Sequence, residues 1–120
     1  MKNTEIINIT DQVNKEIEKS GIKQGVCVVT LNNPCSGFAL LEKDNQEVLD
    51  DVLNELESVF VPRMNYSSDK DPYLVSAISK CAFLSQSKDL LIDNGKLSLD
   101  DKDVYVFNYE ERADINIKCI

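Results

Sequence analysis

A polar turn at residues 32–37 contains the side chains best suited to chemistry. It separates two apolar runs, and the second run ends at Glu42. Cys35 would be a nucleophile if backbone N–H groups or a cation lowered its pKa, and Glu42 would be an acid or a base in a pocket. Asn33 and Ser36 can hydrogen-bond a ligand. Each residue also has a structural explanation, as a buried thiol, a carboxylate at a helix start, or a turn former.

The absence of histidine limits this chemistry. None of the 120 residues is His, which excludes Ser-His-Asp and Cys-His arrangements and imidazole metal ligands. Acid–base catalysis would require a carboxylate, Lys, Tyr or Cys with a shifted pKa. Activation of the Cys35 thiol would fall to the backbone, to Lys80 or to Arg112, which lies in a Glu-Glu-Arg segment between two expected strands.

Length, composition and net charge limit the kinds of partner and site that this chain can have. The length of 120 residues predicts one domain over residues 1–120. The chain is 42% apolar and 28% charged, and its net charge of −8 disfavours nucleic acid and membrane surfaces as partners. No apolar run approaches a membrane span and no signal-peptide pattern follows Met1, so we expect a cytoplasmic location. The four cysteines form no CxxC pair, and the acidic residues between 47 and 57 fit a solvated helix face. We therefore expect no metal and no cofactor.

Apolar periodicity and turn signals predict seven strands and three helices. The strands are expected at residues 5–9, 26–31, 38–41, 89–92, 96–99, 104–109 and 115–119. The helices are expected at residues 10–20, at residues 45–60 and from Pro72, with Thr10 or Asp11 capping the first, Gly21 ending it and Asp71 capping the third. Four strands gathered at the end of the chain favour an α+β fold with antiparallel sheet.

Four segments of the chain follow one another in a recognisable order. They read NITDQVNKEIEKSGIKQGVCVV, NNPCSGFALLE, DNQEVLDDVLNELESV and AISKCAFLSQSKDLLIDNGKLSL. In this order and spacing they resemble the YjbQ-like family, whose members are known as secondary thiamine-phosphate synthase enzymes. The resemblance covers nearly the whole chain. It implies a β-sandwich of mostly antiparallel strands with two or three helices, assembled as a homotrimer.

The departures from the family pattern concern its histidines. Asn33 stands where the family has a histidine, and Ser68 stands near the histidine that follows a tyrosine kept here as Tyr66. Ser76 and Ile78 occupy the positions of paired histidines on the third helix. In the family these histidines and a nearby glutamate suggest a cluster that holds a metal or a phosphate-bearing ligand. Four family-like residues remain: Gly37, Glu42, Lys80 and Gly95.

Two functions are consistent with this pattern. The first is a divergent YjbQ-like protein without the thiamine-phosphate-synthase-like activity of the family, which is the interpretation that the lost histidines favour. The alternative is an enzyme or binding protein that acts on a phosphorylated small molecule through a reshaped pocket around Asn33, Cys35 and Glu42. The candidate catalytic residues are Glu42 and Cys35. The candidate ligand-binding residues are Asn33, Ser36, Gly37, Tyr66, Ser68, Ser76 and Lys80.

Overall fold

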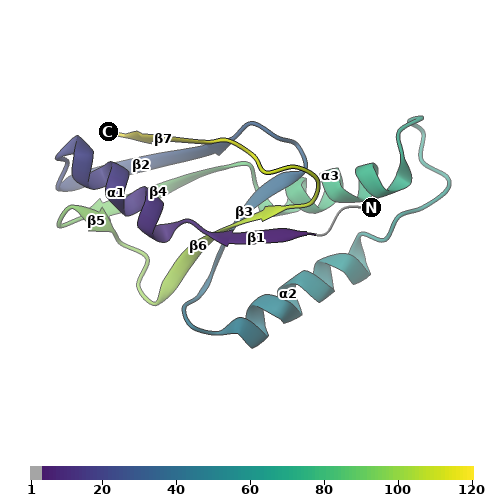
Figure 1. Ribbon diagram of the computed structural model, residues 1–120, viewed down its shortest axis with the longest axis horizontal. Coiled ribbons are helices and arrows are strands. Elements are labelled where there is room, and N and C mark those ends of the chain that lie inside the picture. Colours follow the sequence, from purple (N-terminus) through teal and green to yellow (C-terminus); the bar gives the residue numbers. More distant parts are fainter. Residues whose placement is uncertain (1–3) are drawn as a thin grey trace.

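The computed structural model describes residues 4–120 and contains seven strands and three helices within that range (Figure 1). In chain order they are β1 (Glu5–Asn8), α1 (Thr10–Ser20), β2 (Gln24–Leu31), β3 (Ser36–Glu42), α2 (Gln46–Val59), α3 (Pro72–Leu84), β4 (Ser87–Asp93), β5 (Lys96–Leu97), β6 (Lys102–Asn108) and β7 (Ile115–Cys119). The predicted order of elements is confirmed, and so is the α+β class.

The strands form two antiparallel sheets. Sheet A has the order β1-β6-β3, and sheet B has the order β5-β4-β2-β7. The first and last strands belong to different sheets, since Glu5 on β1 pairs with Asn108 on β6 and Cys27 on β2 pairs with Cys119 on β7. Each sheet is therefore completed by strands that are distant in sequence.

The first hydrophobic core lies between the two sheets. Phe38 and Val106 of sheet A meet Val29 and Ile92 of sheet B there, and Ile17 of α1 closes one end of the gap. Alternation along each strand places these side chains on one face. Burial of such side chains stabilises the fold by about 2 kcal/mol each, so this core holds sheet A and sheet B together.

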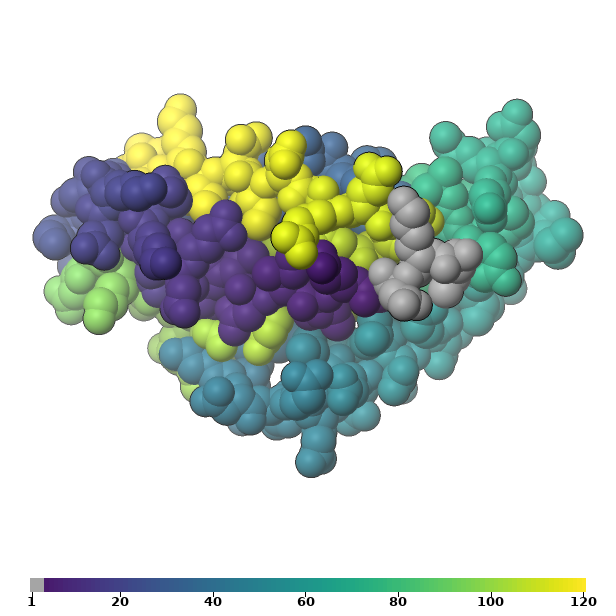
Figure 2. Space-filling model, viewed as in Figure 1, coloured from purple at the N-terminus to yellow at the C-terminus, as the bar shows by residue number. Residues whose placement is uncertain are grey.

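The second hydrophobic core lies on the other face of sheet A, under α2 and α3. Phe107 of β6 and Ala39 of β3 pack there against Leu49 of α2 and Cys81 of α3. In Figure 1, α3 lies at the end of the molecule opposite α1, and α2 lies below the strands of sheet A. Figure 2 shows that α2 lies along one edge of the molecule, with an opening between it and the strand β1. Sheet A is thus covered on both faces, and its end near the helices carries the candidate site.

The predicted helix and turn signals are confirmed, with one correction. Gly21 follows α1 with a φ of 73° in the left-handed region, and Asp71 caps α3 through its side chain. The prediction that Thr10 or Asp11 caps α1 is wrong, because the N-cap is Ile9 and makes no side-chain cap. Thr10 Oγ1 instead accepts a hydrogen bond of 2.9 Å from the Val104 N–H, which joins α1 to sheet A.

No helix within residues 4–120 combines the length and the apolar character that a membrane crossing requires.

Candidate functional site

The side chains of the polar turn hold the turn itself. Asn33 Oδ1 accepts a hydrogen bond of 2.9 Å from the Cys35 N–H, as expected of an Asn turn. The Asn33 carbonyl accepts a hydrogen bond from Gln86 Nε2 at 2.8 Å. Ser36 is fully buried, and its hydroxyl donates to Asn108 Oδ1 at 2.6 Å. The polar groups that looked available for a ligand are thus largely engaged with the protein.

Cys35 sits in an environment that keeps its thiol protonated. It is buried beside the second core. Burial raises the pKa of the Cys35 thiol, the Glu110 carboxylate raises it further, and Lys70 opposes the shift. A reactive cysteine requires the opposite direction, so the surroundings of Cys35 do not activate it as a nucleophile.

We expect thiol titration with an aromatic disulfide to separate the four cysteines. Burial raises the pKa of both Cys27 and Cys81 to about 12, so both thiols stay protonated at pH 8. Cys119 is only partly buried and should supply the single fast phase. That phase should vanish in Cys119→Ser. A fast phase that instead disappears in Cys35→Ser would identify Cys35 as an activated thiol.

Glu42 lies far from this turn. It pairs with Lys102 at one end of β3, whereas Ser36 pairs with Asn108 at the other end. Six residues of extended strand separate the two ends by about 20 Å. Glu42 is exposed and accepts a hydrogen bond of 3.3 Å from Asn45 Nδ2, next to the start of α2. One pocket within a single chain therefore cannot hold both Glu42 and Cys35.

Three other sequence candidates line none of the cavities described for residues 4–120. Ser68 is exposed in the segment between α2 and α3. Tyr66 lies in the same segment, where its hydroxyl donates to the Val61 carbonyl at 3.3 Å. Gly37 lies under α3, and a Cβ atom built on it would be 2.7 Å from the Leu84 Cβ. Close packing of β3 against α3 is enough to require glycine at this position.

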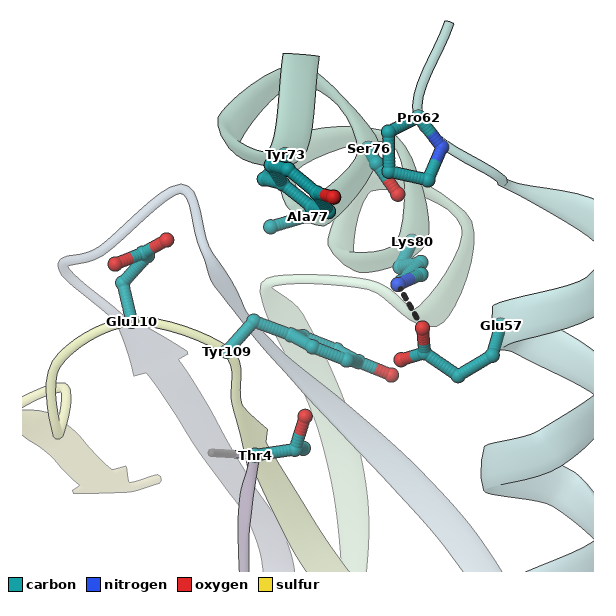
Figure 3. Close-up of a pocket in the computed structure, with 9 residues that line it drawn as sticks. All are labelled: Thr4, Glu57, Pro62, Tyr73, Ser76, Ala77, Lys80, Tyr109 and Glu110. Atoms are coloured by element: carbon teal, nitrogen blue, oxygen red, sulfur yellow. Dashed lines mark ion pairs between the residues drawn. The ribbon is translucent and has the colours of Figure 1, made fainter. Parts of the chain in front are cut away.

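Ser76 and Lys80, in contrast, line one cavity between α3, the end of α2 and the end of β6 (Figure 3). We call it the Lys80 pocket, and its volume is about 80 Å³. It is lined by Thr4, Glu57, Pro62, Tyr73, Ser76, Ala77, Lys80, Tyr109 and Glu110. Of all the candidates from the sequence, only this pair is brought together around a described cavity.

Lys80 is the charged centre of this pocket. Only 5% of the residue is exposed, and its Nζ lies 2.9 Å from Glu57 Oε2 and 4.9 Å from the centre of the Tyr109 ring. Figure 3 shows the ammonium directed toward Glu57 above the Tyr109 ring. A buried ammonium requires a partner of this kind. The Ser76 hydroxyl donates to the Phe60 carbonyl and so ties α3 to the end of α2.

Tyr109 also lines the pocket, and its hydroxyl is buried without a hydrogen-bond partner among the described residues. The residue is 5% exposed. Burial raises the pKa of Tyr109, and the neighbouring Cys81 and Glu57 raise it further. An unpaired buried hydroxyl costs about 1–3 kcal/mol, so this group can gain a partner from a bound molecule that reaches it.

Sequence reasoning did not find Tyr109 or Glu57. The sequence pattern places Tyr109 at the end of an expected strand and Glu57 on an acidic helix face. Both lie near Lys80 only because α2, α3 and the end of β6 pack together at the pocket. No local sequence motif predicts that packing. Ile78, at a family histidine position, packs against the second core. Within residues 4–120, no three His, Cys, Asp or Glu side chains gather closely enough to hold a metal ion.

Comparison with known proteins decides the family. The model for UPF0047 protein YjbQ-like matches residues 1–118. This chain belongs to the YjbQ-like family. The resemblance seen in the sequence is thus confirmed over nearly its full length. No curated protein matches the chain.

Solved structures agree with this assignment. An uncharacterised YjbQ/UPF0047 protein from Clostridium acetobutylicum is 27% identical, with a TM-score of 0.88 over 100% of this chain and 95% of that one. A YbjQ-like protein of unknown function from Sulfolobus solfataricus is 22% identical, with a TM-score of 0.86 over 99% and 88%. A hypothetical protein from Aeropyrum pernix is 15% identical, with a TM-score of 0.84 over 100% and 91%, which shows the shared fold.

Proposed function

We propose that this YjbQ-like protein binds a small polar molecule in the Lys80 pocket and lacks the histidine-dependent chemistry of its family. The observation that carries the proposal is a buried ammonium beside a cavity, next to a buried tyrosine hydroxyl without a partner. Ligand sites combine a concave surface with a few converging polar groups of this kind. At about 80 Å³ this cavity has room for one small polar group of a ligand. The pocket also joins the two sequence candidates that lie on α3, Ser76 and Lys80.

The groups around the pocket support binding better than proton transfer. A general acid or base works best with a pKa near the working pH. The pKa values of Tyr109 and Cys81 are raised by burial, so both groups stay protonated at neutral pH. The chain has no histidine to replace them. The protein is accordingly proposed to be a pseudoenzyme that retains the family fold.

The charges of the pocket favour a ligand that has both a positive and a negative group, or an uncharged ligand with polar groups. Lys80 attracts an anionic group, whereas Glu57 and Glu110 repel it and attract an amine or a hydroxyl. A phosphorylated small molecule is the second candidate. It is favoured by the position of Lys80, which is the family-like lysine, and it requires the phosphate to compete with Glu57 for the ammonium.

Thermal-shift titration tests the proposal. The ligands are inorganic phosphate, thiamine phosphate, its two phosphorylated precursors, zwitterionic amino acids and zinc. We expect one polar organic ligand to give a saturable rise in Tm. The rise should be lost in Lys80→Met and reduced in Tyr109→Phe. It should persist in Lys102→Met, which removes a half-exposed lysine elsewhere.

Other outcomes would contradict this assignment. A rise that survives in Lys80→Met and is lost in Asn33→Ala or Cys35→Ser would place the site at the polar turn instead. No rise with any of these compounds would leave the pocket without a ligand function.

A homotrimer and a cytoplasmic location belong to the same proposal. The homotrimer rests on membership in the family, and sedimentation equilibrium measures it directly. A reducing compartment suits four cysteines that are free thiols.

A further inference from the structure

A second concave surface lies on the outer side of α2, away from the Lys80 pocket. We call it the α2 groove, and its volume is about 350 Å³. Its apolar walls are Val48, Val52, Leu56, Val59, Phe60 and Phe83. Val59 is 59% exposed and Phe83 is 72% exposed. The rings of Phe60 and Phe83 lie 5.8 Å apart, so the ends of α2 and α3 form one wall together.

The groove exists because the apolar face of α2 is wider than sheet A can cover. Leu49 and Leu56 are buried in the second core. Val48, Val52 and Val59 lie on an adjacent stripe, because positions four and seven residues apart share a helix face. The stripe extends over twelve residues, from Val48 to Val59, or about 16 Å along the helix. Val52 and Phe60 also contact the second core, whereas Val59 and Phe83 are exposed. A concave apolar surface with exposed side chains at one end is typical of an interaction site.

The rim of the groove is acidic. Asp51 and Glu55, one helical turn apart, line it beside the valines. The whole of α2 contains five carboxylates and neither Lys nor Arg. A twofold contact between two copies of this surface would bring their carboxylates together, which like-charge repulsion opposes. The net charge of −8 makes the other surfaces of a second copy acidic on average as well. The charge of the groove is instead complementary to a basic partner.

We propose that the α2 groove binds a basic amphipathic α-helix of another protein. Apolar side chains at positions i, i+4 and i+7 of that helix would pack on Val52, Val59 and Phe83, as in other helix-in-groove complexes. Lys or Arg beside the apolar stripe would lie next to Asp51 and Glu55. About three turns of helix match the 16 Å length of the groove. The groove does not depend on the function of the Lys80 pocket.

Fluorescence anisotropy with labelled helical peptides tests this inference. The probes are a small panel of 14-residue peptides with Leu or Phe on one face and Lys or Arg beside it. We expect at least one member to bind to the full chain. Binding should weaken at least tenfold in Phe83→Asn and in Val59→Asn, and at least tenfold in Asp51→Lys/Glu55→Lys. Asp50→Lys, which changes an α2 carboxylate outside the groove lining, should have less than a threefold effect.

Controls make the outcome decisive. Circular dichroism must show that each variant keeps its fold, which exposed substitutions allow. A scrambled peptide with the same composition and no apolar face should bind at least tenfold more weakly. The proposal is overturned if no peptide of the panel binds, or if the groove variants bind as wild type does. It is also overturned if Phe83→Asn dissociates an oligomer in sedimentation, because the groove would then be covered by a second copy.

Discussion

Gly37→Ala is expected to lower the free energy of unfolding by about 2 kcal/mol. A Cβ atom at this position would lie 2.7 Å from the Leu84 Cβ and 3.3 Å from the Cys81 Cα. Neither of these atoms is the flexible end of a side chain, so α3 as a whole would have to move away from β3. Urea denaturation of the wild type and the variant measures the difference.

A second substitution shows whether close packing is the cause. Leu84→Gly removes the Cβ atom that the methyl group added by Gly37→Ala would meet at 2.7 Å. In the double variant, the effect of Gly37→Ala should be smaller than in the wild-type background, because residues in contact are not additive. A loss of stability below about 0.5 kcal/mol in Gly37→Ala, combined with a loss of ligand stabilisation, would instead support the ligand-binding role that the sequence suggested.

Removal of Glu57 is expected to lower the stability of the fold more than removal of Lys80. Glu57→Ala should destabilise the fold by about 2 kcal/mol, because the Lys80 ammonium would remain buried without a carboxylate. Lys80→Met should stay within about 1 kcal/mol of the wild type or gain stability, because it removes the buried charge and fills similar space. The 41% exposure of the Glu57 side chain lets water reach that carboxylate once it is alone. Thermal and urea unfolding of both variants check this order.

Two further variants complete this test. The double variant Lys80→Met/Glu57→Ala should recover most of the stability lost in Glu57→Ala, since no unpaired buried charge remains. Glu55→Ala, also on α2, should change stability by less than about 0.5 kcal/mol. Equal losses in Lys80→Met and Glu57→Ala would contradict the asymmetry and would show that the pair itself stabilises the fold.

The fold was largely predictable because local signals determine most of it. Gly21 ends α1, Asp71 and Pro72 begin α3, and Asn94-Gly95 forms the β4–β5 turn with φ values of 54° and 78°. The capping of α1 was not predictable in the same way. Thr10 has the chemistry of an N-cap, but its hydroxyl accepts a bond from the distant strand β6 instead. A tertiary contact there overrides the local preference.

The candidate site was predictable only in part. Lys80 and Ser76 share α3, one turn apart, so helical spacing places them on one face. Glu57 and Tyr109 join them from α2 and from the end of β6, and their approach depends on packing over the whole second core. Glu42 and Cys35 are close in sequence, yet an extended strand carries them to opposite ends. The sequence therefore predicted one pocket for Cys35 and Glu42, whereas the length of β3 keeps them apart within a single chain.

The pairing of the terminal strands also governs the order in which the chain can fold. The partner of β1 begins at Lys102, and β2 remains an edge of sheet B until residues 115–119 are in place. Neither sheet can be completed from the first hundred residues alone. Such distant pairings slow folding, because a large loop must close before its contacts form. One edge of β2 therefore stays unpaired until residues 115–119 are available, and an unpaired strand edge of this kind exposes a folding chain to aggregation.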